Sequence, residues 1–161
     1  MSKYWGISLI EILIALFIGS IIIFFSVNSI ADYFTHRKQD VYMQQLYHDL
    51  KWARTEAVAL NIPVAIQPYH DDKVATDWCQ GWAVYKNPQG NGLQDSTQIL
   101  KIRAASESAC HIVFSSSLGF DSFQFQPQGN SNYQNGHFYF YNGEKLIKKI
   151  IINQVGRVRW E

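Results

Sequence analysis

The hydrophobic positions of this 161-residue chain follow three successive patterns. An almost uninterrupted apolar run extends from Ile7 to Ile30, and helical spacing and then short alternating segments come after it. A helix rises about 1.5 Å per residue, so the run is long enough to cross the roughly 30 Å hydrocarbon core of a membrane. Its apolar side chains favour insertion by more than the cost of the single charged residue, Glu11. We therefore expect a transmembrane helix over residues 7–31.

The pattern beyond Ala31 indicates that this helix continues as an amphipathic helix over about residues 32–61. Apolar residues at spacings of three and four predict one buried stripe, made of Tyr42, Leu46, Leu50, Ala53, Ala57 and Leu60. The opposite face is expected to be solvated and carries Lys38, Gln45, His48, Lys51 and Glu56. Asn61 and Pro63 end the pattern because proline disfavours a helical conformation in the residue before it. One helix from about Ser8 to Leu60 is predicted.

From residue 63 onward the period changes to two, which predicts a β-rich body over residues 63–161. The expected strands are Val64–Gln67, Trp82–Lys86, Gln98–Arg103, His111–Phe114, Phe123–Gln126, His137–Tyr141, Lys145–Asn153 and Arg157–Trp160. Asn142-Gly143 predicts a two-residue type I′ turn. The fold class is α+β, with a long N-terminal helix packed on antiparallel sheets, and residues 32–161 have the length of one globular domain.

Composition and charge limit the possible functions. The net charge is only +1, so a nucleic-acid role would have to depend on a local patch. Cys79 and Cys110 allow one disulfide, with two buried free thiols as the alternative. The histidines lack zinc spacing. The acidic loop of His70, Asp71, Asp72 and Asp77 lacks the alternating order of a calcium loop, so we expect no metal and no cofactor. Because no nucleophile elbow, phosphate loop or catalytic carboxylate pair is present, we expect no enzyme activity.

The last eighteen residues concentrate positive charge, with five basic and two acidic side chains. The basic residues are Lys145, Lys148, Lys149, Arg157 and Arg159. Arg157 and Arg159 are two apart, so on a strand both point to one face. Aligned cations of this kind suit phosphate oxygens, and the alternative is an edge strand that its charges protect from pairing.

The expected pairing of this last hairpin assumes that residues 153–156 form its loop. Ile152 then faces Arg157 and Ile150 faces Arg159, with Lys148 on the same face. The opposite, core-facing set would be Ile147, Ile151, Val158 and Trp160. A shift of one residue would reverse the two faces of the longer strand.

The N-terminus resembles the class III signal of type IV prepilins and pseudopilins. A short polar leader with Lys3 ends in Gly6, and Glu11 is the fifth residue after it. The resemblance implies that a prepilin peptidase cuts after Gly6, that the new terminus at Ile7 is methylated, and that Glu11 pairs with a neighbouring pilin's amine during assembly. A secretory signal would need a shorter apolar region, and a plain anchor would not account for Glu11. The implied location is the inner membrane, as a single-pass protein with a cytoplasmic N-terminus and a periplasmic domain, and the cell exterior once the filament is assembled.

Landmarks along the rest of the chain resemble the FimT/GspH family of minor pilins and pseudopilins. They are Asp77-Trp78-Cys79-Gln80-Gly81-Trp82-Ala83-Val84-Tyr85, Phe125-Gln126-Pro127-Gln128-Gly129, Gly136-His137-Phe138 and Gly156-Arg157-Val158-Arg159. The last motif resembles that of FimT-type minor pilins, which bind double-stranded DNA in natural transformation. The resemblance therefore implies non-specific DNA binding at Gly156, Arg157 and Arg159 with the three nearby lysines. A structural pseudopilin of a type II secretion system is the alternative.

Overall fold

The computed structural model describes residues 8–106, 110–131 and 133–161, without the side chains of residues 24–36. Its first element is α1 (Leu9–Leu60), so the single long helix is confirmed. The chain divides between Arg37 and Lys38 into two compact units.

The N-terminal unit consists, where it is described, of the first part of α1. Its large apolar side chains between Leu9 and Ile23 are exposed, and so is Glu11. Over the described residues, no helix combines the length and the apolar character needed to cross a membrane. The expected leader, Ile7 and the side chains of residues 24–31 lie outside the described residues, so the cleavage site and the 7–31 segment stay predictions.

The later part of α1 supplies one wall of the core in the second unit. Five residues of the predicted stripe are buried, from Tyr42 to Ala57, and Met43 is buried beside them. Leu60 is an exception, because it is the last residue of the helix and is exposed. The helix ends where Asn61 takes a positive φ of 53°, a common conformation just beyond a helix C-terminus.

The first sheet has the strand order β2-β1-β3-β4, and β6 also pairs with β1. Its strands are β1 (Val64–His70), β2 (Lys73–Val74), β3 (Trp82–Lys86), β4 (Ile99–Arg103) and β6 (Phe123–Phe125), and all pairs are antiparallel. The sequence did not predict β2, which follows β1 through Asp71 and Asp72, both at positive φ. Two short 3-10 helices were also not predicted, η1 (Trp78–Gln80) and η2 (Ser96–Gln98). Because η2 includes Gln98, β4 begins one residue later than expected.

The second sheet has the order β5-β7-β8-β9, again with antiparallel pairs. Its strands are β5 (Ile112–Ser116), β7 (Gly136–Asn142), β8 (Lys145–Ile152) and β9 (Val158–Trp160). The expected type I′ turn is wrong in detail, because Asn142 pairs with Lys145 and the two loop residues are Gly143 and Glu144. Gly143 alone has a positive φ, of 60°, so the loop has glycine at its first position, as in a type II′ turn.

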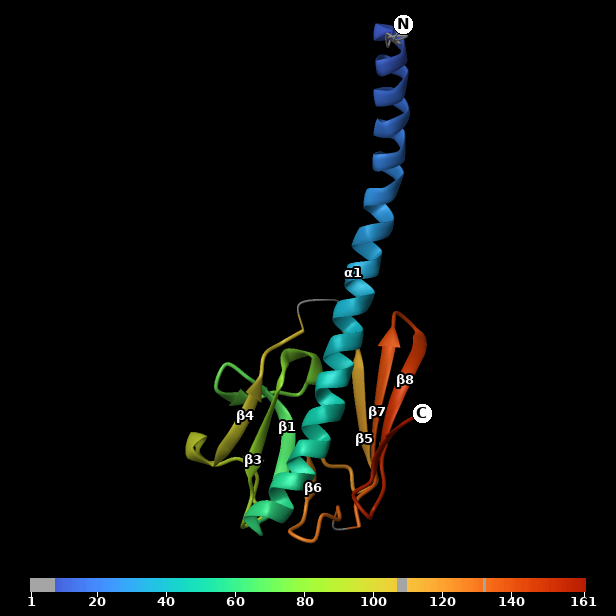
Figure 1. Ribbon diagram of the computed structural model, residues 1–161. Helices are drawn as coiled ribbons and strands as arrows, with labels where there is room; N and C mark the ends of the chain where they lie inside the picture. Colours follow the sequence, from blue (N-terminus) through green and yellow to red (C-terminus); the bar gives the residue numbers. More distant parts are fainter. Residues whose placement is uncertain (1–7, 107–109, 132) are drawn as a thin grey trace, which may run out of the picture. The chain divides into compact units, whose positions relative to one another are not determined.

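The core of the second unit lies where α1 meets the inner faces of both sheets. Figure 1 shows the C-terminal half of α1 running between β1, β3 and β4 on one side and β5, β7 and β8 on the other. Fully buried side chains come from all three layers, including Leu50 of α1, Trp82 of β3 and Phe138 of β7. The α+β class with a helix packed on antiparallel sheets is therefore confirmed.

Candidate nucleic-acid interface

The turn between β8 and β9 places the two arginines singled out in the sequence. The backbone N–H of Asn153 donates to the carbonyl of Arg157 over 3.3 Å, which leaves a three-residue loop of Gln154, Val155 and Gly156. The Asn153 side-chain oxygen accepts from the Arg157 N–H at 2.8 Å. Gly156 has a φ of 77°, the left-handed conformation that typically ends such loops. The loop is therefore one residue shorter than the sequence suggested.

This shorter loop makes the predicted register of the hairpin wrong by one residue. Ile151 lies opposite Arg159, while Ile150 and Ile152 lie opposite Trp160 and Val158. Ile150 and Ile152 are buried, so they and not Ile147 and Ile151 face the core. Ile147 is exposed and lies where the pairing of β7 with β8 shifts by one residue.

The predicted alternation within the last strand is confirmed. Arg157 and Arg159 are exposed, Val158 is buried, and Trp160 packs partly buried against the core. The tight fit at Gly156 fixes the start of this strand. A Cβ at Gly156 would lie 2.0 Å from the carbonyl oxygen of Gly129, so only glycine allows this approach.

Both arginines line a cleft between α1 and β9, with a volume of about 450 Å³. We call it the α1–β9 cleft, and its lining consists of Tyr47, Lys51, Arg54, Thr55, Gly156, Arg157, Val158, Arg159 and Trp160. Four of these described side chains are cationic and none is acidic. Positive charge in a groove with an apolar wall attracts anions more strongly than the same charges on an open surface.

The sequence did not predict the helical wall of this cleft. Tyr47 stacks on Trp160, with ring centroids 5.0 Å apart and planes 25° apart. The Lys51 ammonium lies 5.2 Å from the Tyr47 ring centroid. Arg54 donates from Nε to the Gly129 carbonyl at 2.8 Å and from a terminal nitrogen to the Val155 carbonyl at 3.3 Å. The spacing of four and three places these three residues on one face of the helix, which was the available signal. In the sequence alone, such a face looks like an ordinary solvated one, because nothing shows that β9 lies beside it.

The three lysines predicted to join the arginines do not line the cleft. Lys148 pairs with Asp40 of α1 at 3.2 Å, and Lys149 pairs with Glu161 at 3.1 Å. Lys145 is exposed beside the β7–β8 loop, at the opposite end of β8 from the β9 loop. The structure thus brings together Gly156, Arg157 and Arg159 of the predicted site, and it adds Lys51 and Arg54.

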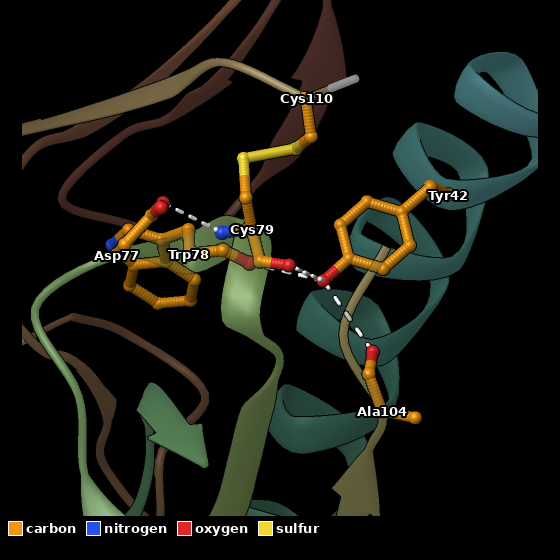
Figure 2. Close-up of a disulfide and its surroundings, with 6 residues drawn as sticks. All are labelled: Tyr42, Asp77, Trp78, Cys79, Ala104 and Cys110. Carbon is orange, nitrogen blue, oxygen red and sulfur yellow. Dashed lines mark hydrogen bonds between the residues drawn. A yellow bond between two sulfur atoms is a disulfide. The ribbon is translucent and has the colours of Figure 1, made fainter. Parts of the chain in front are cut away.

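The predicted disulfide between Cys79 and Cys110 is present and closes part of the core (Figure 2). Tyr42 of α1 reaches the same segment, where its hydroxyl donates to the Trp78 carbonyl at 3.0 Å with the Cys79 and Ala104 carbonyls close by. Burial raises the pKa of Tyr42 well above its ordinary value, so it stays a donor. The hydroxyl therefore fastens η1 to the helix, and the bridge joins η1 to the segment that leads into β5.

A second set of polar contacts joins α1 to the first sheet. The carboxylate of Asp49, only 1% exposed, accepts from the indole nitrogen of Trp82 at 3.0 Å, from Arg103 Nε at 2.7 Å and from the Lys101 ammonium. Burial disfavours the charged form, but the hydrogen bonds from Arg103, Lys101 and Trp82 outweigh it and lower the pKa of Asp49. This carboxylate is therefore an ionised, fully bonded structural group.

The described residues contain no group of three or more His, Cys, Asp or Glu side chains that could hold a metal ion. Glu11 lies in the first turn of α1 and is exposed. Its proposed pairing and the cleavage after Gly6 depend on groups outside the described residues.

Comparison with solved structures establishes the type of fold. Two crystal structures of the Pseudomonas aeruginosa type IV minor pilin FimU share this fold. The one in space group P21 is 21% identical with a TM-score of 0.59, and the alignment covers 80% of this chain and 92% of that chain. The one in space group P65 is 19% identical with a TM-score of 0.56 and covers 76% and 91%. At these identities the similarity establishes the fold alone, which is type IV pilin-like.

The family follows from the sequence. The family model "Type II transport protein GspH" matches residues 43–156, well over half of the chain. The chain therefore belongs to the GspH family of minor pilins and pseudopilins, and the resemblance drawn from its motifs is confirmed at that level. A search of curated proteins found no match. The family match ends at Gly156, so the two arginines of the α1–β9 cleft lie beyond it.

Proposed function

We propose that this chain is a minor pilin that binds double-stranded DNA without sequence preference, and that it aids DNA uptake in natural transformation. Arg157 and Arg159 contact the phosphate backbone. The observation that carries the proposal is the charge of the α1–β9 cleft. Its described lining contains four cationic side chains and no carboxylate, although the net charge of the chain is only +1.

The chemistry of the cleft favours phosphate over bases. A guanidinium presents several N–H donors in a plane and suits phosphate oxygens, and contacts of this kind carry no sequence information. The aromatic rings in the cleft, Tyr47 and Trp160, stack on each other, which favours the backbone over base stacking as the contact. A small number of phosphate contacts corresponds to binding in the micromolar range or weaker at physiological salt.

The proposal is tested with the full chain purified in a neutral detergent and a fluorescent 20–30 base-pair duplex, followed by fluorescence anisotropy. Arg157→Gln with Arg159→Gln is expected to weaken binding by more than tenfold and to lower the salt slope by about two. The matched control is Lys73→Gln with Lys86→Gln, which removes the same charge from the first sheet. Equal weakening in both double variants, or none in the first, would refute the proposal.

Assembly into a filament completes the proposed role. We place the chain in the inner membrane before assembly and among other pilins afterwards, after cleavage behind Gly6 by a prepilin peptidase and methylation of Ile7. The exposed apolar side chains from Leu9 to Ile23 support this, because contiguous exposed apolar surface marks contact with lipid or protein. Glu11→Gln is expected to leave cleavage intact and to reduce incorporation into filaments, measured in sheared filament fractions.

The second candidate is a structural pseudopilin of a type II secretion system, which the family description favours. In that case deletion of the gene would impair protein secretion and leave transformation unchanged. The DNA-binding proposal predicts the reverse, so the two assays on one deletion strain separate the candidates.

A further inference from the structure

The helical wall of the α1–β9 cleft is built by a stripe of α1 that lies beside the fully buried one, and its Tyr47 packs against the edge of the core as well as lining the cleft. Tyr47, Lys51 and Arg54 follow one another at spacings of four and three, so their side chains lie on one face of the helix. The fully buried residues of α1 form a different set, including Leu46, Leu50 and Ala53. Besides its core-facing side, α1 therefore presents a second face, which forms the cleft together with β9.

An aromatic contact holds the Lys51 ammonium close to the place where α1 meets β9. It lies 5.2 Å from the centroid of Tyr47, and that ring stacks on Trp160 of β9. Lys51 is exposed, and no ion pair engages it among the described residues. Lys148 and Lys149 differ in this respect, because each is paired with a carboxylate. Lys51 is thus the lysine of the cleft available to an anion.

Arg54, also on the helical wall, forms a hydrogen bond that reaches across to the β8–β9 loop. Its hydrogen bond to the Val155 carbonyl ties the helix to the loop that precedes Arg157, and its hydrogen bond to the Gly129 carbonyl ties the helix to the segment between β6 and β7. They use two of the five N–H donors of a guanidinium, and Arg54 still lines the cleft. It is a positioning residue, which sets the distance between the helix and the strand that carries the arginines.

We infer that the cleft holds one sugar–phosphate backbone between its two walls, with Lys51 of α1 contacting phosphate from one side and Arg157 and Arg159 from the other. The inference rests on the proposed DNA binding and extends it, because it makes the helix part of the binding surface. Contacts from two walls fix the path of the bound backbone along the cleft, whereas an arginine pair on a free edge strand would not.

The test compares the full chain in neutral detergent with its Lys51→Gln and Lys73→Gln variants, using the same fluorescent duplex at several salt concentrations. Each phosphate contact contributes about 0.9 to the slope of log K against log salt, which is roughly eightfold in affinity at 0.1 M salt relative to 1 M. Lys51→Gln is expected to weaken binding by up to that factor and to lower the slope by about one. Lys73→Gln lies on β2 and is expected to change neither.

The outcomes separate this inference from the proposal beneath it. If the unmodified chain binds duplex and Lys51→Gln binds equally well with the same slope, the helical contact is refuted and DNA binding through the arginines stands. If the unmodified chain does not bind, both fail. Because Lys51 is exposed, its substitution leaves the fold intact, and an unchanged circular dichroism spectrum and urea midpoint confirm that the comparison is valid.

Discussion

Asp49 offers the sharpest test of how the helix is fixed to the first sheet. Replacing it with alanine removes the shared acceptor of Trp82, Lys101 and Arg103. The buried indole N–H then lacks a partner, which costs about 1–3 kcal/mol. Removal of one partner from a fully buried ion pair costs about 3–5 kcal/mol. Here the cationic side chains of Lys101 and Arg103 are 30% and 33% exposed and recover some hydration, so the whole loss is expected to be about 3–4 kcal/mol.

The measurement is urea unfolding of the full chain in neutral detergent, followed by far-ultraviolet circular dichroism. With a slope of about 2 kcal/mol per molar urea, Asp49→Ala is expected to lower the midpoint by roughly 1.5–2 M. Asp49→Asn keeps an acceptor for Trp82 and is expected to lose less. Asp121→Ala, an exposed carboxylate, is the control and is expected to change the midpoint by less than about 0.3 M.

The same group predicts a pH dependence. The pKa of Asp49 in the folded state is below its ordinary value, so its contribution to stability is complete above about pH 4 and is lost as the pH falls through the folded-state pKa. Asp49→Asn is expected to remove this part of the acid destabilisation. A midpoint for Asp49→Ala within about 0.5 M of the unmodified chain, with an unchanged acid profile, would refute the reasoning.

Two further predictions concern the disulfide and the β8–β9 loop. Cys79→Ser with Cys110→Ser opens a loop with a sequence separation of 31 and is expected to lower the free energy of unfolding by about 3–4 kcal/mol. Urea unfolding measures this loss, and reduction of the unmodified chain is the parallel experiment. Equal urea midpoints with and without the disulfide would contradict the prediction. Gly156→Ala combines a left-handed backbone with a clash against Gly129 and is expected to cost about 2–4 kcal/mol and to weaken DNA binding. Gly90→Ala, at a similar φ of 74° in open space, is the control and should show the backbone cost alone.

The sequence predicted the elements of this fold well because each has a local cause. The helical stripe from Tyr42 to Ala57, the end of α1 near Pro63 and the strands of both sheets depend on periodicity and turn residues. The pairing of Cys79 with Cys110 needed only a count of two. The predictions that failed concern details set by the backbone conformation of a single residue. The β8–β9 register is an example, because the positive φ of Gly156 allows a shorter loop.

The candidate site was predicted in part for a related reason. Arg157 and Arg159 lie in one motif, so their common face could be inferred from a period of two. Lys51 is more than one hundred residues away, and its place beside them depends on how α1 is rotated against the second sheet. Asp49 was missed as well, because a buried carboxylate and a solvated one leave the same hydrophobic pattern in the sequence.

The three-residue loop of Gln154, Val155 and Gly156 has a consequence for how this site can evolve. Side chains alternate along β9, so the length of the loop decides whether the two arginines or Val158 and Trp160 face outward. One inserted residue would turn Val158 and Trp160 outward and direct both guanidinium groups into the core. Substitutions within the loop can accumulate gradually, but a change in its length would abolish the site in one step, and related chains that bind DNA in this way should therefore vary here in residue type and not in residue number.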